Sequence, residues 1–172
     1  MELGPVDRIT VGAVGEPGER TFYLQARRGE HIVTLLVEKQ QVQLLSATVV
    51  DILSRLGTEV EAVEPTEEAM ALEEPLVPDW RAGRLAIGYE EDRDLLLLEA
   101  EEVPEDEEDE EQLLNAGALR LWATREQMLA LARHGVAVAA AGRPTCEFCG
   151  NPIDPEGHVC VAMNGHGDLG RI

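Results

Sequence analysis

Hydrophobic and polar residues alternate along the first part of the chain. The alternation is weak over residues 7–14, residues 20–28 place Phe22, Leu24 and Ala26 on one face, and residues 30–38 carry apolar side chains on both faces. A period of two is typical of β-strands, and apolar residues on both faces indicate a central strand. Short glycine-containing turns separate the three segments, so we expect three antiparallel strands.

The period changes at residues 40–56. Apolar residues recur there at steps of three and four, which predicts a helix with one apolar face. These residues are Val42, Leu45, Val49, Ile52, Leu53 and Leu56. Gly57 is expected to end the helix, and its apolar face should lie across the three-stranded sheet.

The same order of elements recurs in the second half of the chain. Strand patterns lie at residues 84–90, 95–102 and 118–123, and a second helix pattern follows them. We therefore predict an α+β fold built from two three-strand-plus-helix units with antiparallel sheet, over residues 7–57 and 80–142. Together they form one domain, 1–142, and residues 143–172 form a zinc knuckle and tail.

The second helix has a recognisable start. Thr124 and Gln127 have the spacing of a capping box, in which each side chain bonds the backbone of the other residue. Gly135 should weaken this helix locally. His134 comes late in the helix, where a partial positive charge should suit the helix dipole.

Two acidic stretches interrupt these patterns. Residues 58–79 are rich in Glu and Pro, and we interpret them as a mostly irregular acidic linker with a short helix near residues 66–72. Trp80 follows as the expected core anchor of the second unit. Residues 99–111 contain many acids and no base, so their mutual repulsion predicts a solvated, disordered loop.

The residues after the second helix have the spacing of a metal site. The expected ligands are Cys146, Cys149, His158 and Cys160, which include all three cysteines of the chain. Two residues between the first pair allow a tight turn to aim both thiolates at one ion. His158 and Cys160 lie two apart, so an extended segment presents both on one face. A Cys₃His set closes a tetrahedron, which indicates structural Zn²⁺.

Three alternatives to this assignment remain open. His166 could replace His158 as the fourth ligand, although it lies in a glycine-rich tail. Cys146 and Cys149 could form a redox pair, but such a pair is expected to follow a strand and to open a helix. The cysteines could also be unpaired, buried thiols.

Charge and composition narrow the classes of partner. The 172 residues carry 34 acids and 14 bases, a formal charge of −20. Because phosphates are bound mainly by Lys and Arg, this balance argues against nucleic acid and against anionic membranes. Cysteines confined to one cluster fit a reducing compartment, and no segment has the pattern of a signal peptide or a membrane span. We expect a cytoplasmic protein.

Three segments of the chain resemble a known family. Residues 11–27, 37–42 and 141–160, the last with its Cys-x₂-Cys and His-x-Cys pairs, are similar to a bacterial family of uncharacterised proteins, a domain of unknown function. The resemblance covers nearly the whole chain and implies no established activity. Family members commonly carry a proline after the last cysteine, where this chain has Val161.

Three functions are compatible with the sequence. The closed ligand set and the lack of a GxSxG, HExxH or Walker motif favour a zinc-stabilised binding or adaptor module with an unknown protein partner. The alternative is an enzyme for a small anionic or phosphorylated substrate, with Arg27 and Arg28 near the glycine turn at Gly15 to Gly18 as candidate ligands. Nucleic-acid binding through the knuckle is third, given the charge balance.

Overall fold

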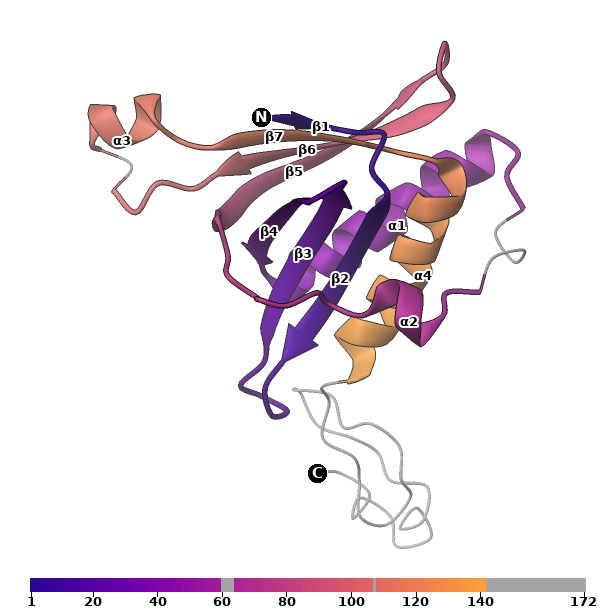
Figure 1. Cartoon of the computed structure of the whole chain (residues 1–172), viewed down its shortest axis with the longest axis horizontal. Helices are drawn as coiled ribbons and strands as arrows, with labels where there is room; N and C mark the ends of the chain where they lie inside the picture. Colours follow the sequence, from indigo (N-terminus) through magenta and orange to yellow (C-terminus); the bar gives the residue numbers. More distant parts are fainter. Residues whose placement is uncertain (60–63, 107, 142–172) are drawn as a thin grey trace, which may run out of the picture.

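A single mixed sheet organises the part of the chain that the computed structural model describes, residues 1–59, 64–106 and 108–141 (Figure 1). Its seven strands follow the order β1-β7-β6-β5-β4-β3-β2. The strands are β1 (Glu2–Leu3), β2 (Arg8–Val14), β3 (Thr21–Arg28), β4 (His31–Val37), β5 (Trp80–Glu90), β6 (Leu95–Glu102) and β7 (Ala118–Ala123). The helices of the described residues are α1 (Lys39–Arg55), α2 (Glu67–Met70), α3 (Glu110–Leu114) and α4 (Arg125–Ala141). The α+β class is confirmed.

Two parallel pairings make the sheet mixed, so the prediction of an antiparallel sheet is only partly correct. β4 and β5 pair in parallel through Leu35 with Trp80 and Leu36 with Arg81. α1 carries the chain back along the sheet between these strands, and a crossover of this kind returns the next strand in the same direction. The other parallel pair adds β1 to β7. β1 was missed because two residues are too few to show a period.

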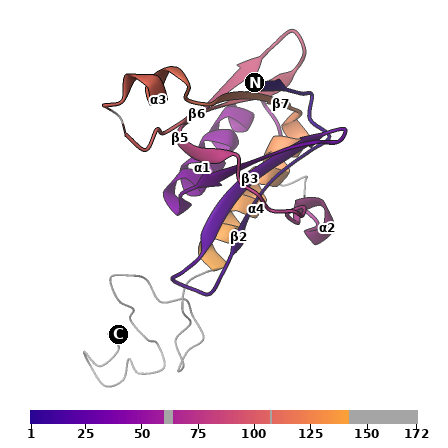
Figure 2. The same ribbon diagram turned by 60° about the vertical axis from the view of Figure 1, so that its left-hand side comes forward.

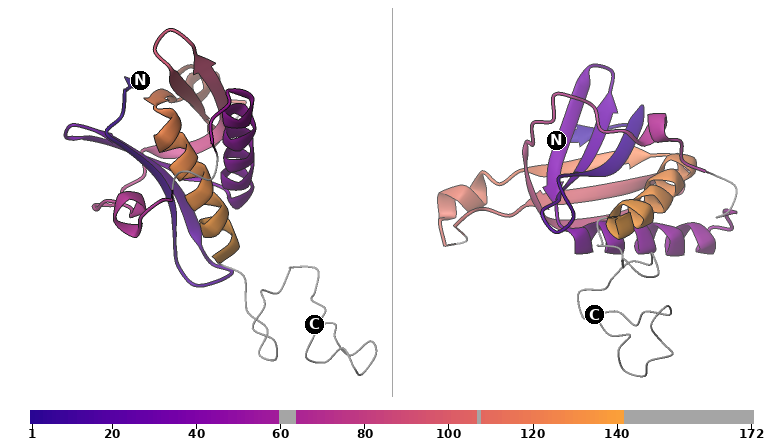
Figure 3. Two further views of the ribbon diagram at one scale, coloured as in Figure 1. Left: turned by 90° about the vertical axis from the view of Figure 1, so that its right-hand side faces the viewer. Right: turned by 90° about the horizontal axis from the view of Figure 1, so that it is seen from below.

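Both long helices cover one face of the sheet. Figure 3 (left) shows α1 and α4 side by side, with the strands β2 and β3 beyond α4. The buried positions of α1 are Val42, Leu45, Ser46, Val49 and Leu53, close to the predicted apolar face. They meet aligned rows of strand residues such as Val11, Leu24 and Leu35, each at most 1% exposed. Burial of these aliphatic rows is the main source of stability here.

Residues 64–79, which we call the strap, cover the opposite face of β2, β3 and β4. Figure 1 shows the strap passing in front of these strands while α1 lies behind them. A row of paired polar residues, Thr10, Gln25 and Thr34, is buried beneath it at 1–2% exposure. The sequence suggested only an acidic linker with a short helix. α2 confirms the helix, and the polar row shows that the strap is part of the folded structure.

The acidic tract is more ordered than we predicted. β6 continues to Glu102, and α3 begins beyond the tract's centre, where the Asp109 side chain accepts hydrogen bonds from the backbone of Glu111 and Gln112. Acidic residues suit the first turn of a helix because its N-terminus carries a partial positive charge. Figures 2 and 3 show α3 projecting from the ends of β6 and β7, away from the rest of the described chain.

Several local predictions about the helices are confirmed. Thr124 and Gln127 form the expected capping box, with N–H···O distances of 2.9 and 3.1 Å. Gly57 follows α1 with a φ of 78°, a conformation that favours glycine. Trp80 is half-buried and packs against the core. None of the helices in the described ranges has the length and hydropathy needed to cross a bilayer.

Candidate functional site

The predicted zinc ligands lie outside the described residues. Cys146, Cys149, His158 and Cys160 all belong to residues 142–172, as does the alternative ligand His166. The last described element before them in the sequence is α4, which ends at Ala141. Within the described ranges, no three His, Cys, Asp or Glu side chains come together in a group that could hold a metal.

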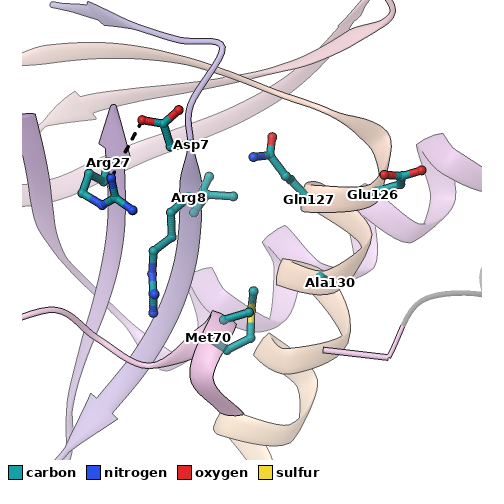
Figure 4. A pocket seen from close by; sticks show the side chains of 9 residues that line it. Asp7, Arg8, Arg27, Met70, Glu126, Gln127 and Ala130 are labelled. Carbon is teal, nitrogen blue, oxygen red and sulfur yellow. Dashed lines mark ion pairs between the residues drawn. The ribbon is translucent and has the colours of Figure 1, made fainter. Parts of the chain in front are cut away.

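Arg27, one of the candidate ligands from the sequence, lines a pocket of about 400 Å³ (Figure 4). The pocket lies where the start of β2 and the end of β3 meet α2 and the first turns of α4. The lining residues are Asp7, Arg8, Ile9, Arg27, Ala69, Met70, Glu126, Gln127 and Ala130. Figure 4 shows the Arg8 side chain extending along the strand toward α2, with Arg27 next to Asp7.

The cations of this pocket are already engaged by the protein itself. The Nε of Arg27 lies 3.2 Å from both carboxylate oxygens of Glu73 in the strap, and its Nη1 lies 3.9 Å from Asp7. Arg8 donates to the carbonyl of Ala71, so it too holds the strap. Its Nε is buried without a hydrogen-bond partner among the described residues. Arg27 neutralises Glu73, and both arginines fasten the strap, which is a structural role.

The anion site suggested by Arg27, Arg28 and the glycine turn does not form. Both arginines are at the end of β3, whereas Gly15 and Gly18 are in the turn that precedes its start. An eight-residue strand separates them by roughly 25 Å. Arg28 donates a hydrogen bond of 2.9 Å to the carbonyl of Pro5. The expectation was wrong because the glycine turn and the two arginines, although close in the sequence, lie at opposite ends of β3.

A second polar cluster ties the two halves of the described chain together. Arg125, the first residue of α4, donates to Asp94 at 2.6 Å and to the Tyr89 hydroxyl at 3.0 Å. Its Nη1 also reaches the carbonyl of Leu56 at 3.2 Å and the hydroxyl of Thr58 at 3.1 Å. The hydrogen bond from Arg125, with a second from Tyr89, lowers the pKa of Asp94. The cluster joins the β5–β6 turn to the end of α1, so its role is to hold these two segments in place.

His134 differs from its predicted role. It lies in the middle of α4, and burial against the sheet lowers the pKa of its imidazole, an effect that a hydrogen bond with the backbone of Val11 partly offsets. We expected a cation that favours the helix dipole, but the neutral form is the one that suits this position. Partial desolvation disfavours the imidazolium, and a residue in the middle of a helix gains little from the helix dipole, whose effect is confined to the end turns.

Sequence comparison gives the chain a family. No curated protein and no solved structure matches it. The family described as "Protein of unknown function (DUF3090)" matches residues 1–160, a span that runs from the start of the chain to Cys160. The match covers most of the 172 residues, and the chain therefore belongs to the DUF3090 family.

Proposed function

We propose that this protein is a cytoplasmic zinc-stabilised binding module that acts as an adaptor for a protein partner. Cys146, Cys149, His158 and Cys160 hold one structural Zn²⁺ in this proposal. The observation that carries it is the spacing of these four residues, with Cys-x₂-Cys followed by His-x-Cys in a turn-rich segment. The family match extends over all four positions.

The donor set suits zinc and leaves no open coordination position. Three thiolates and one imidazole satisfy a tetrahedral ion, so no water remains bound to be activated for hydrolysis. Binding would contribute on the order of 10–16 kcal/mol of apparent free energy at neutral pH, enough to order a segment rich in glycine and proline. Reduced thiols are needed for this set, which favours the cytoplasm.

The position of the cysteines supports zinc over a redox pair. The last described element before Cys146 is α4, which ends at Ala141. A redox Cys-x₂-Cys pair typically follows a strand and begins a helix, whose N-terminus stabilises the thiolate. Here the pair follows a helix.

Binding is favoured over catalysis by the way the described polar groups are used. In the pocket of Figure 4, Arg27 is paired with Glu73, and Gln127 donates to the carbonyl of Val6 at 2.8 Å while it caps α4. A catalytic group must be available to a substrate, whereas these side chains hold the protein together.

Two histidine variants test the metal assignment. His158→Ala should lose bound zinc, whereas His166→Ala, a matched change in the same segment, should keep one zinc per chain. Metal content is measured by inorganic mass spectrometry on protein purified without added metal, together with a count of reactive thiols. Retention of zinc in His158→Ala and loss in His166→Ala would move the fourth ligand to His166. Full metal content in Cys149→Ala would contradict the ligand set altogether.

The adaptor function has its own test. A partner is identified by cross-linking with the zinc-loaded protein and is then titrated against wild type and Cys149→Ala as purified proteins. We expect the variant to lose affinity at least about tenfold, because the metal-ordered segment contributes to the interface. Equal affinity would separate the partner site from the metal, and failure to find a saturable partner would refute the adaptor function.

A further inference from the structure

A second pocket, of about 320 Å³, gathers basic side chains on a chain that is strongly acidic overall. It lies where the end of β4, the first residue of α1 and the starts of β3 and β5 come together. Three cations line it, Arg20, Lys39 and Arg81, against one carboxylate, that of Glu38. The local balance is therefore positive, whereas the whole chain carries −20.

Two of these cations already contact other parts of the described chain. Arg20 donates from Nη1 to the carbonyl of Val138 in α4 at 3.0 Å, and its guanidinium lies 5.3 Å from the ring centre of Phe22. Arg81 is 2.6 Å from the carboxylate of Glu38. A guanidinium group that already has a protein contact gives up less rotamer freedom when it binds a ligand.

The third cation, Lys39, makes no such contact within the described residues. Lys39 is half-buried, and it forms no ion pair or side-chain hydrogen bond within residues 1–59, 64–106 and 108–141. A cation that only balanced surface glutamates would be expected to lie against one of them. Lys39 instead faces a pocket whose other charged groups are mostly positive.

We propose that this pocket binds a doubly charged oxyanion of the phosphate class. The guanidinium groups supply planar, two-pronged donors for phosphate oxygens, and the ammonium of Lys39 supplies a compact positive charge. The pocket is at the lower end of the size range of small-molecule sites, which suits a phosphate group with little attached to it. None of the described residues that line the pocket is a proposed zinc ligand.

The sequence provides a direct reporter of this pocket, because Lys39 is the only lysine of the chain. Acetylation by an amine-reactive ester is followed by peptide mass spectrometry, with the α-amine of Met1 as internal control. The Met1 amine donates to the carbonyl of Ala118, next to β1. In the sheet, β7 and β6 lie between β1 and β5, so two strands separate this control amine from the β5 side of the pocket. The probes are inorganic phosphate and glycerol 3-phosphate, each compared with chloride at equal ionic strength.

At saturating phosphate we expect Lys39 to react at least about threefold more slowly while Met1 keeps its rate, since an occupied site excludes the reagent. Arg20→Gln should abolish the protection. Arg55→Gln removes the same charge from the far end of α1, where the Arg55 side chain is 78% exposed, and this variant should keep the protection of Lys39. Stronger protection by glycerol 3-phosphate identifies a phosphate ester as the ligand, and stronger protection by phosphate identifies the free ion.

Either of two results overturns the proposal. One is an unchanged Lys39 rate with both probes in the wild-type protein, a measurement that needs no variant to fold. The other is equal protection in Arg20→Gln and wild type, which would show that the anion does not use this pocket. Because zinc content is read separately, neither result bears on the metal site.

Discussion

Gln25 is the residue whose replacement tests the role of the strap most sharply. Its side chain is 2% exposed on the face of β3 that the strap covers. The Nε2 group donates to the Thr34 hydroxyl at 3.1 Å and to the carbonyl of Glu73 at 3.0 Å, and the Oε1 atom accepts from the Glu73 N–H at 2.7 Å. Gln25→Met keeps the approximate size of the side chain and removes all three hydrogen bonds.

The expected loss follows from these contacts. A neutral hydrogen bond contributes about 1 kcal/mol net, so three of them give about 3 kcal/mol. Glu73 is only half-buried, so water can recover part of the interaction, and we expect Gln25→Met to lower the free energy of unfolding by about 2–3 kcal/mol. The strap should open locally before the sheet does, because its main attachments are polar.

Urea denaturation and hydrogen exchange measure the two parts of this prediction. Gln43→Met is the matched control, since it makes the same substitution at an exposed position of α1, and it should change stability by no more than about 0.5 kcal/mol. In Gln25→Met, the amides of residues 64–79 should exchange faster, while those of β6 and β7 should change little. Equal stability and equal exchange in Gln25→Met and wild type would refute the view that the polar row fastens the strap.

Three further changes test other parts of the fold. Gly135→Ala should lower the melting temperature despite alanine's better helix propensity, because the added Cβ would overlap the Ser46 hydroxyl. The double variant with Ser46→Ala should regain the lost stability. A Gly135→Ala variant more stable than wild type would contradict this packing. Burial lowers the pKa of His134, so as the pH falls the unfolded state takes up a proton before the folded state does. The free energy of unfolding should therefore decrease as the pH drops below about 6.5 toward the folded-state pKa. His134→Gln should flatten this part of the stability curve, and an unchanged slope would oppose the assignment. Arg125→Gln removes the largest cause of the lowered pKa of Asp94, so NMR titration should show that pKa rising toward its ordinary value.

The longer helices and strands were predictable because each shows its period over six or more residues. The strands β2, β3 and β4 and the helix α1 were found from apolar spacing, and the start of α4 from the capping box at Thr124. The parallel pairing of β4 with β5 was missed, although a long helix between two strands already implies a crossover.

The polar contacts could not be predicted from periodicity. Thr10, Gln25 and Thr34 occupy strand positions that face away from the helices, where polar residues usually meet water. Here they meet the strap, and only the register of three strands reveals that they form one row. Arg27 was put forward as an anion ligand, whereas in the structure it pairs with Glu73, which lies in a segment without a pattern.

The central claim is that the chain carries one structural zinc, and its most direct test is the zinc content of wild-type protein purified without added metal. We predict one zinc per chain, with the thiols of Cys146, Cys149 and Cys160 protected from alkylation until a chelator is added. Protein that contains no zinc and has three freely reactive thiols would contradict the account and favour a redox role for Cys146 and Cys149.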